Sequence, residues 1–457
     1  MIKKDFNALK TIIEQQLCCG CGTCAGICPK DAVYFPNNNY FPEWFNEEEC
    51  TKCGSCVKVC PGKGLNIDEI TRKSKTSGQK YLEDIGNYIN FKIGHSKDKF
   101  IRNKSSSGGV ATSLLMYALE KKIIDKAIVV VNDDKEVAKP VVKITNSKKV
   151  LIDSMQSKYI QVPLNTALKE ILHNDKKYGV VGLPCHIEGL ELAQNMYKSL
   201  SNRIIFKIGL FCGYSYSYDC MDALLNEIEC KKDSVNKFLG WREGTNYPGF
   251  FAVQLKNGKK LCLSYFEEHN ITVANYALFR CFLCIDGLSQ LSDISLGDTT
   301  DTKSNSTFII TRTKIGKKLL SLAKASEYID YYELKEDRAL KEGIIPFMVT
   351  EKRQKVLAVI NYISRRGIPV PQWDIQKSKI NQIDKINSIL RIKLVFLIRS
   401  PFIRRLLLSR PELMKIVGGY VYKIDIDLKK ALYFKIIKVL EKSPGLTRIK
   451  ALLRHNG

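Results

Sequence analysis

The chain lacks any long apolar run and any recognisable export signal. No stretch of about eighteen apolar residues occurs among its 457 residues, which excludes a conventional membrane-spanning helix. Its first residues, MIKKDFNALKTIIEQQL, are too charged for a secretory signal and predict a short amphipathic helix. Sixteen cysteines without such a signal fit a reducing compartment, so we expect a cytoplasmic protein.

Acidic residues are few relative to basic ones. Asp and Glu number 47 against 72 Lys and Arg, which gives a formal net charge of +25. The sequence shows no helix-turn-helix, zinc-finger or ribonucleoprotein motif, so we expect no nucleic-acid partner. A basic surface attracts acidic redox proteins such as ferredoxin, and the alternative is an ordinary solvated surface.

Sets of residues typical of acid–base catalysis are also missing. No Ser/His/Asp set or pair of carboxylates stands out, so the sequence assigns no catalytic residues. The composition, 45% hydrophobic and 26% charged, is that of an ordinary globular protein and excludes a disordered chain. A chain of this length predicts two or three domains.

Cysteine, in contrast, is abundant and clustered near the start of the chain. The run CCGCGTCAGICP contains the spacing C-x2-C-x2-C-x3-C-P, and CTKCGSCVKVCP repeats it. Two such runs are typical of bacterial ferredoxins with two 4Fe-4S clusters, in which the fourth cysteine of each run binds the other cluster. The expected ligands are Cys18, Cys21, Cys24 and Cys60 for cluster 1, and Cys50, Cys53, Cys56 and Cys28 for cluster 2.

Glycines in these runs favour the cluster interpretation. Gly20, Gly22 and Gly54 permit the tight curl that brings three thiolates to one cluster. Zinc sites favour two spaced pairs of ligands, so a pair of zinc sites fits this pattern poorly, and a disulfide framework is the other alternative. Cys19 has no place in the scheme, and we expect it to be a spectator.

A serine- and glycine-rich loop precedes a predicted helix further along the chain. In RNKSSSGGVATSLLMYALEKK, apolar residues from Val110 to Leu119 follow a helical spacing. The free backbone N–H groups of such a loop and the positive end of the helix dipole suit a phosphate or a flavin. A plain helix cap explains the same residues.

Short β-branched runs then alternate with helical stretches, which predicts an α/β domain. Two of these strands, GVVGLPC and IIFKIGLFCG, lead into Cys185 and Cys212, at the ends where ligands gather in α/β sheets. A CxxC follows at Cys281 and Cys284. These four thiols match the number that a third cluster needs, whereas buried structural cysteines and a redox-active dithiol are the alternatives.

Several motifs in this order resemble the beta subunit family of coenzyme F420 hydrogenase and dehydrogenase, whose cofactor is a deazaflavin. They are SSSGGVATSLLMYALE, SKYIQ, VGLPCHIEGL, GLFCG, RCFLC and DISLGD. The likeness extends over residues 1–335, and the N-terminal two-cluster module is similar to that of the family's bacterial members. It implies FAD in the α/β domain with a further 4Fe-4S cluster beside it.

The resemblance also implies which residues serve these cofactors. It implies that the flavin lies against the loop, where it contacts Ser106, Ser107, Gly108 and Gly109, and that Lys158 is nearby. It also implies that the ligands of a third cluster are Cys185, Cys212, Cys281 and Cys284. The family commonly has glutamine at the position of His186. This histidine could contact a cluster sulfur, touch the flavin or be an ordinary buried histidine.

We therefore predict an α/β protein, α+β overall, in three parts. These are a ferredoxin-like domain at residues 1–72, an FAD and Fe–S domain at 73–335, and a basic, mainly helical segment at 336–457. In the last part basic residues interleave with apolar ones, and prolines at 401, 411 and 444 interrupt the helices. This segment could pack on the enzyme or a partner, or make weak contact with an anionic membrane surface.

The predicted function is that of an iron–sulfur flavoprotein oxidoreductase. Electrons would pass between a one-electron donor such as ferredoxin and a small-molecule hydride acceptor, because a flavin converts between one-electron and hydride chemistry. The acceptor stays open among the deazaflavin coenzyme, a nucleotide sugar, another metabolite and a partner's cofactor. The rival interpretation is a non-catalytic electron-transfer subunit of a larger complex, without flavin chemistry of its own.

Overall fold

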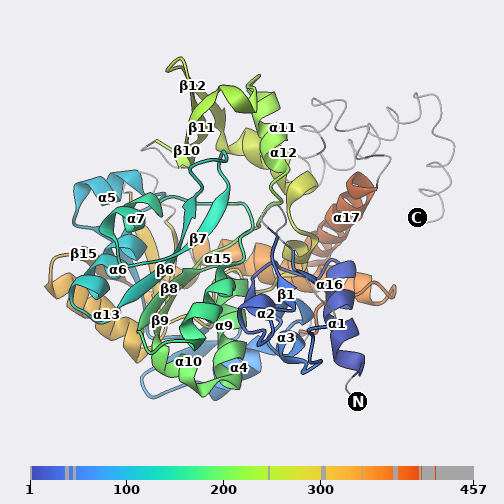
Figure 1. The fold of residues 1–457 in the computed structure, drawn as a ribbon, viewed down its shortest axis with the longest axis horizontal. Coiled ribbons are helices and arrows are strands. Elements are labelled where there is room, and N and C mark those ends of the chain that lie inside the picture. Colours follow the sequence, from blue (N-terminus) through green and yellow to red (C-terminus); the bar gives the residue numbers. More distant parts are fainter. Residues whose placement is uncertain are drawn as a thin grey trace.

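The computed structural model describes residues 3–36, 41–44, 48–244, 248–299, 305–341, 343–373 and 379–400, together with residues 403 and 417. Its architecture is mixed α/β, which confirms the predicted fold class (Figure 1). Within the described residues, no helix combines the length and apolar character that crossing a bilayer requires. The predicted breaks after residue 400 lie outside the described residues.

An eight-stranded sheet forms the centre of the molecule. Its strand order is β15-β5-β14-β13-β9-β8-β6-β7, and the four neighbours β13, β9, β8 and β6 run parallel. The bounds of the eight strands are β5 Asn90–Ser96, β6 Lys126–Asn132, β7 Pro140–Thr145, β8 Tyr178–Gly182, β9 Ile204–Leu210, β13 Ile294–Asp298, β14 Thr307–Thr311 and β15 Ile329–Leu334.

Helices cover both faces of this sheet because its strands are apolar on both faces. In β6, Ala127 and Val129 belong to one buried cluster, whereas Ile128 between them belongs to another. The first cluster is completed by helices α6 (Val110–Glu120) and α13 (Lys314–Ala325). Helices on the second face are α8 (Leu168–Leu172), α9 (Pro184–Met196) and α10 (Lys198–Arg203).

The cysteine-rich start of the chain folds as a small unit beside α9 (Figure 1). Its elements are α1 (Lys3–Glu14), α2 (Thr23–Gly26), β1 (Val33–Tyr34), β2 (Glu43–Trp44), α3 (Ser55–Lys58), the 3₁₀ turn η1 (Pro61–Lys63) and α4 (Ile67–Lys73). The short hairpin β3 (Lys80–Leu82) and β4 (Gly86–Tyr88) follows and leads into β5.

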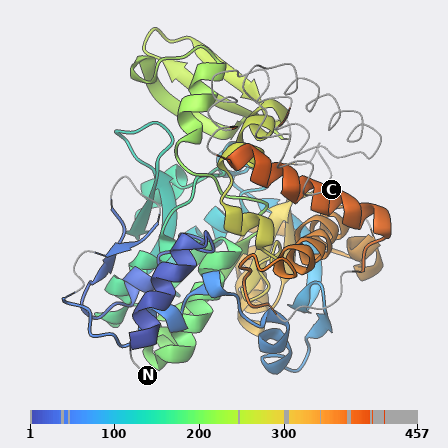
Figure 2. The ribbon, with the colours of Figure 1, turned by 90° about the vertical axis from the view of Figure 1, so that its right-hand side faces the viewer.

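Two further parts complete the molecule. A three-stranded antiparallel sheet with two helices projects from one end (Figure 1); its elements are β10 (Val235–Glu243), β11 (Phe250–Leu255), β12 (Lys260–Ser264), α11 (Cys220–Glu227) and α12 (Tyr265–Tyr276). The C-terminal helices α14 (Glu336–Lys341), α15 (Ile344–Val349), α16 (Lys355–Ser364) and α17 (Gln382–Arg399) lie together, and α17 reaches α12 (Figure 2). A π-helical turn, η5 (Thr350–Gln354), joins α15 to α16.

Candidate electron-transfer and cofactor site

The two cysteine runs adopt the same local structure. Gly22 and Gly54, each directly after the second cysteine of its run, have left-handed backbones and begin α2 and α3. In the first run Gly20 donates its N–H to Cys18 Sγ over 3.3 Å, and in the second run Lys52 donates to Cys50 Sγ over 3.4 Å. Both donors have positive φ, 62° and 55°. The repeat seen in the sequence is therefore a repeat of backbone conformation and of hydrogen bonds to sulfur.

The structure brings together the cysteines that the sequence pairs across the runs. The first thiol set contains Cys18, Cys21, Cys24 and Cys60, and the second contains Cys28, Cys50, Cys53 and Cys56. Burial raises the pKa of Cys18, and the neighbouring thiols of Cys60 and Cys21 raise it further. Burial likewise raises the pKa of Cys56 to about 12, with contributions from Cys28, Cys53 and Cys50.

The third thiol set lies near the first set, and two of its thiols follow strands of the central sheet. It contains Cys185 at the start of α9, Cys212 after β9, and Cys281 and Cys284 around the 3₁₀ turn η4 (Phe279–Leu283). Burial raises the pKa of Cys212, which Cys281 and Cys284 raise further. Cys185 is electrostatically coupled to Cys212 and also to Cys21 of the first set. Because β8 and β9 pair in parallel, Cys185 and Cys212 after them lie at the same edge of the sheet.

Cys19, which we expected to be a spectator, joins the first and third sets. The neighbouring thiol of Cys185 raises the pKa of the Cys19 thiol, whereas that of Cys21 lowers it. It is buried, with 5% exposed surface. A doubled cysteine at the start of the run was the signal in the sequence, but its neighbour lies 166 positions away and follows from the tertiary fold alone.

These thiols fit iron–sulfur clusters chemically. All sixteen cysteines are unpaired, and a buried thiolate needs a cation to offset its loss of hydration. Iron provides that charge in a cluster with four thiolate ligands. Among the described residues, no three His, Cys, Asp or Glu side chains converge closely enough to hold a single metal ion.

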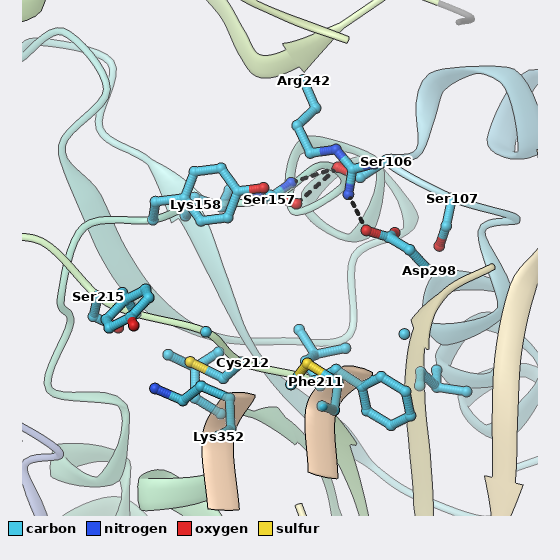
Figure 3. Close-up of a pocket in the computed structure, with 18 of the residues that line it drawn as sticks. Ser106, Ser107, Ser157, Lys158, Phe211, Cys212, Ser215, Arg242, Asp298 and Lys352 are labelled. Atoms are coloured by element: carbon cyan, nitrogen blue, oxygen red, sulfur yellow. Dashed lines mark hydrogen bonds and ion pairs between the residues drawn. The ribbon is translucent and has the colours of Figure 1, made fainter. Parts of the chain in front are cut away.

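A cavity of about 610 Å³ extends from the serine- and glycine-rich loop to Cys212 (Figure 3). This volume lies within the usual range for small-molecule sites. The cavity is bordered by the N-terminus of α6 and the ends of β8, β9 and β13. Its lining includes Ser106, Ser107, Gly109 and Lys158 of the predicted flavin contacts.

Two of the predicted flavin contacts pack against or hydrogen-bond to the local backbone. Gly108 packs away from this lining, since a Cβ there would lie 2.6 Å from the carbonyl oxygen of Gly94. Lys158 donates from Nζ to the carbonyl oxygens of Ser154 and Met155, both over 2.6 Å, at the end of helix α7 (Lys148–Asp153). Burial lowers the pKa of Lys158 to about 7.

His186 is a buried residue with a structural role, and it also borders the cavity. Its Nδ1 accepts the backbone N–H of Leu183 over 3.1 Å, and its Nε2 lies 3.0 Å from the carbonyl oxygen of Val162. The ring is therefore the neutral tautomer with hydrogen on Nε2, and both nitrogens are occupied by backbone. Burial lowers the pKa of His186 to about 4.

Charged side chains from three parts of the chain meet in the cavity. Arg242 of β10 pairs with Asp298 of β13 over 2.7 Å and connects the projecting sheet to the central one (Figure 3). Lys352 of η5 lies beside Cys212 and donates to the carbonyl oxygen of Cys281 over 2.9 Å. Arg391 of α17 donates to the Tyr214 hydroxyl over 2.9 Å. The sequence offered no motif for this contribution of the C-terminal helices.

Family profiles match most of the chain up to the C-terminal helices. The profile of the N-terminal part of the coenzyme F420 hydrogenase/dehydrogenase beta subunit matches residues 92–169, and that of its C-terminal part matches residues 175–337. A 4Fe-4S dicluster domain matches residues 10–75. This chain belongs to the coenzyme F420 hydrogenase/dehydrogenase beta subunit family. The resemblance inferred from the motifs is thus confirmed.

The chain is similar to individual proteins of Methanocaldococcus jannaschii and Methanosarcina barkeri. The chain is 28% identical over 348 residues to the coenzyme F420-dependent sulfite reductase of Methanocaldococcus jannaschii, covering 73% of this chain but half of that protein. It is 29% identical over 272 residues to the coenzyme F420 hydrogenase subunit beta of Methanosarcina barkeri, covering 58% of this chain and 88% of the relative.

A solved structure supports the same assignment. A chain of the F420-reducing [NiFe] hydrogenase complex from Methanosarcina barkeri superposes with a TM-score of 0.52 at 26% identity, covering 64% of this chain and 98% of the other. The relatives are oxidoreductases or their subunits, and the dicluster domain carries iron–sulfur clusters, so this chain has a redox, electron-transferring role.

Proposed function

We propose that the protein is an iron–sulfur flavoprotein oxidoreductase that passes electrons between a one-electron donor and a small-molecule hydride acceptor. One observation carries this proposal: the cavity beside the loop at Ser106 and Ser107 reaches Cys212, which belongs to a chain of thiol sets ending at the molecule's cysteine-rich unit. A bound flavin supplies the conversion between single electrons and hydride. FAD is the form that we propose for this site.

The loop before α6 would hold the anionic part of the cofactor. Ser106 is itself fixed, because its Oγ accepts the backbone N–H of Ser157 over 2.8 Å and lies 3.0 Å from the Ser157 hydroxyl. Gly109 begins α6 with a left-handed backbone, so the first N–H groups of that helix are directed toward the loop. These donors and the helix dipole favour a phosphate.

We propose a 4Fe-4S cluster in each of the three thiol sets. The first and second sets match the dicluster domain, and the third adjoins both the first set and the cavity. The role of the chain is to keep the thiols close, to exclude water from them and to tune the potentials through hydrogen bonds to sulfur. Cys19 would be part of the contact between the first and third sets.

The donor that we favour is a ferredoxin or a similar acidic redox protein in the cytoplasm. A net charge of +25 attracts such a partner over long range, and the unpaired state of all sixteen cysteines fits a reducing compartment. The names of the relatives make coenzyme F420 one candidate for the hydride acceptor. The same site would suit another small hydride-accepting molecule.

A second candidate function is that of an electron-transfer subunit without flavin chemistry of its own. It is favoured by relatives that are named as hydrogenase subunits and by a structural neighbour that belongs to a complex. The two candidates differ in the flavin. Protein purified without oxygen and then denatured should release non-covalent FAD, identified by chromatography and fluorescence, if the cavity holds it. Release of iron and sulfide without FAD would support the second candidate, an electron-transfer subunit without flavin chemistry.

A further inference from the structure

Arg280 is a buried arginine between the cysteine-rich unit and the central domain. It lies in η4, directly before Cys281, and only 2% of its surface is exposed. Its Nη2 donates to the carbonyl oxygen of Pro61 over 3.2 Å, directly after Cys60 of the first thiol set. The side chain therefore extends from the third set to the backbone of the first.

The C-terminal segment holds this arginine in place. The guanidinium lies 4.8 Å from the ring centroid of Trp373, whose Nε1 donates to the carbonyl oxygen of Leu283 over 3.0 Å. The neighbouring Gln372 donates its N–H to the carbonyl oxygen of Lys63 over 2.6 Å. Both residues lie beyond the matched family profiles, which end at residue 337.

Two donors of Arg280 have no acceptor among the described residues. Its Nε and Nη1 are buried without a hydrogen-bond partner there, and the same holds for both carboxylate oxygens of Glu188. Leaving a buried donor of a charged group unpaired costs more free energy than an ordinary hydrogen bond contributes. Arg280 and Glu188 attract each other electrostatically, but these atoms form no hydrogen bond with one another in the described part of the chain. The free donors therefore indicate an acceptor that the described residues do not provide.

The surroundings of the guanidinium identify the chemistry of that acceptor. Cys284, Cys19, Glu188 and Cys281 interact electrostatically with Arg280, and so does Cys18 of the first set. An anionic iron–sulfur cluster in either set would present sulfur acceptors and negative charge to these donors. Arginine suits such a position because it stays charged and carries its donors on a rigid plane.

We propose that Arg280 is a positioning residue that bridges the first and third thiol sets and raises the reduction potentials of the clusters bound there. This inference rests on the proposed function, specifically on clusters in those sets. The guanidinium donates to cluster sulfur through Nε and Nη1 and stabilises the added negative charge of the reduced state. No bond forms or breaks at Arg280, and one electron passes between the two sets at a time. Trp373 keeps the plane oriented.

The test is a potentiometric titration followed by EPR on the full-length protein purified without oxygen. Arg280→Gln should lower the equilibrium constant for reduction of the first-set and third-set clusters at least tenfold, which is about 59 mV for a one-electron couple. The second-set cluster should be unchanged and serves as an internal control. Arg280→Lys, which keeps the charge but loses the planar donors, should give a smaller shift at the same two clusters.

Arg366→Gln is the matched control, because Arg366 also stacks on an aromatic ring, Tyr362, but is exposed. Potentials of Arg280→Gln equal to those of the control would overturn the proposal. If Arg280→Gln does not retain iron, Arg280→Lys decides, and unchanged potentials in that variant overturn the proposal. The iron content of the unmodified protein distinguishes a failure of the proposed function from a failure of the proposal for Arg280. If the third set holds no iron, the proposed third cluster is wrong. The potential of the first-set cluster in Arg280→Gln then still tests the role of Arg280.

Discussion

At the scale of single residues, the site depends on side chains whose polar atoms form hydrogen bonds with the backbone. His186 is held as a neutral ring between the N–H of Leu183 and the carbonyl oxygen of Val162, where α9 begins. Lys158 similarly caps the end of α7. These residues fix the cavity wall and leave the loop at Ser106 and Ser107 as the polar part that can receive a ligand.

The buried His186 makes stability sensitive to acid. Its pKa is about 4 in the folded protein against about 6.5 in an unfolded chain, so between these values the unfolded state binds more protons and stability falls as pH falls. Between about pH 6.5 and 5.5 the expected loss is about 1 kcal/mol. His186→Gln should remove this part of the pH dependence in anaerobic urea unfolding. An unchanged slope in that variant would show that His186 is not the group responsible.

At the scale of elements, the cysteine-rich unit and α9 approach each other through glycines. A Cβ on Gly189 of α9 would lie 2.1 Å from Thr23 Oγ1, and one on Gly26 of α2 would lie 2.1 Å from the carbonyl oxygen of Asn165. Asn165 Nδ2 donates to Thr23 Oγ1 and to the carbonyl oxygen of His186, both over 2.8 Å. This packing sets the separation of Cys21 and Cys185.

Gly189→Ala should therefore push α9 away from α2. We expect a loss of about 1–3 kcal/mol of folding free energy from overpacking, together with reduced iron content. Gly213→Ala is the control, because a Cβ there meets no atom within 4 Å. Thermal unfolding and iron analysis would measure both effects. Equal stability of the two variants would contradict the close packing described here.

Local patterns predicted the local structure of the site and the grouping of its thiols, but not the contacts between the thiol sets. The helical spacing after Gly109 predicted α6, and the strands leading into Cys185 and Cys212 are the parallel neighbours β8 and β9. The sequence predicted a spectator at Cys19 and no role for Arg280 of the RCFLC motif, because their contacts are with residues distant in sequence, such as Cys185 and Pro61. No local motif can report such contacts.

At the scale of the whole molecule, the thiol sets form one continuous series. The second set adjoins the first, since Cys56 is electrostatically coupled to Cys24, and the first adjoins the third through Cys19 and Cys185. The third set borders the cavity at Cys212. Beyond the matched family profiles, helices line this cavity and Trp373 packs at the contact between the sets, which gives the described residues after 337 a structural role at the site.

The most direct test of this account is quantification of iron, acid-labile sulfide and flavin in the intact chain purified without oxygen. Three 4Fe-4S clusters and one flavin site predict about twelve irons, as many sulfides and one FAD per chain. Replacing Cys212 and Cys281 together by serine should remove about four irons and leave the other eight or so. A protein that binds no iron, or zinc in its place, would contradict the central claim.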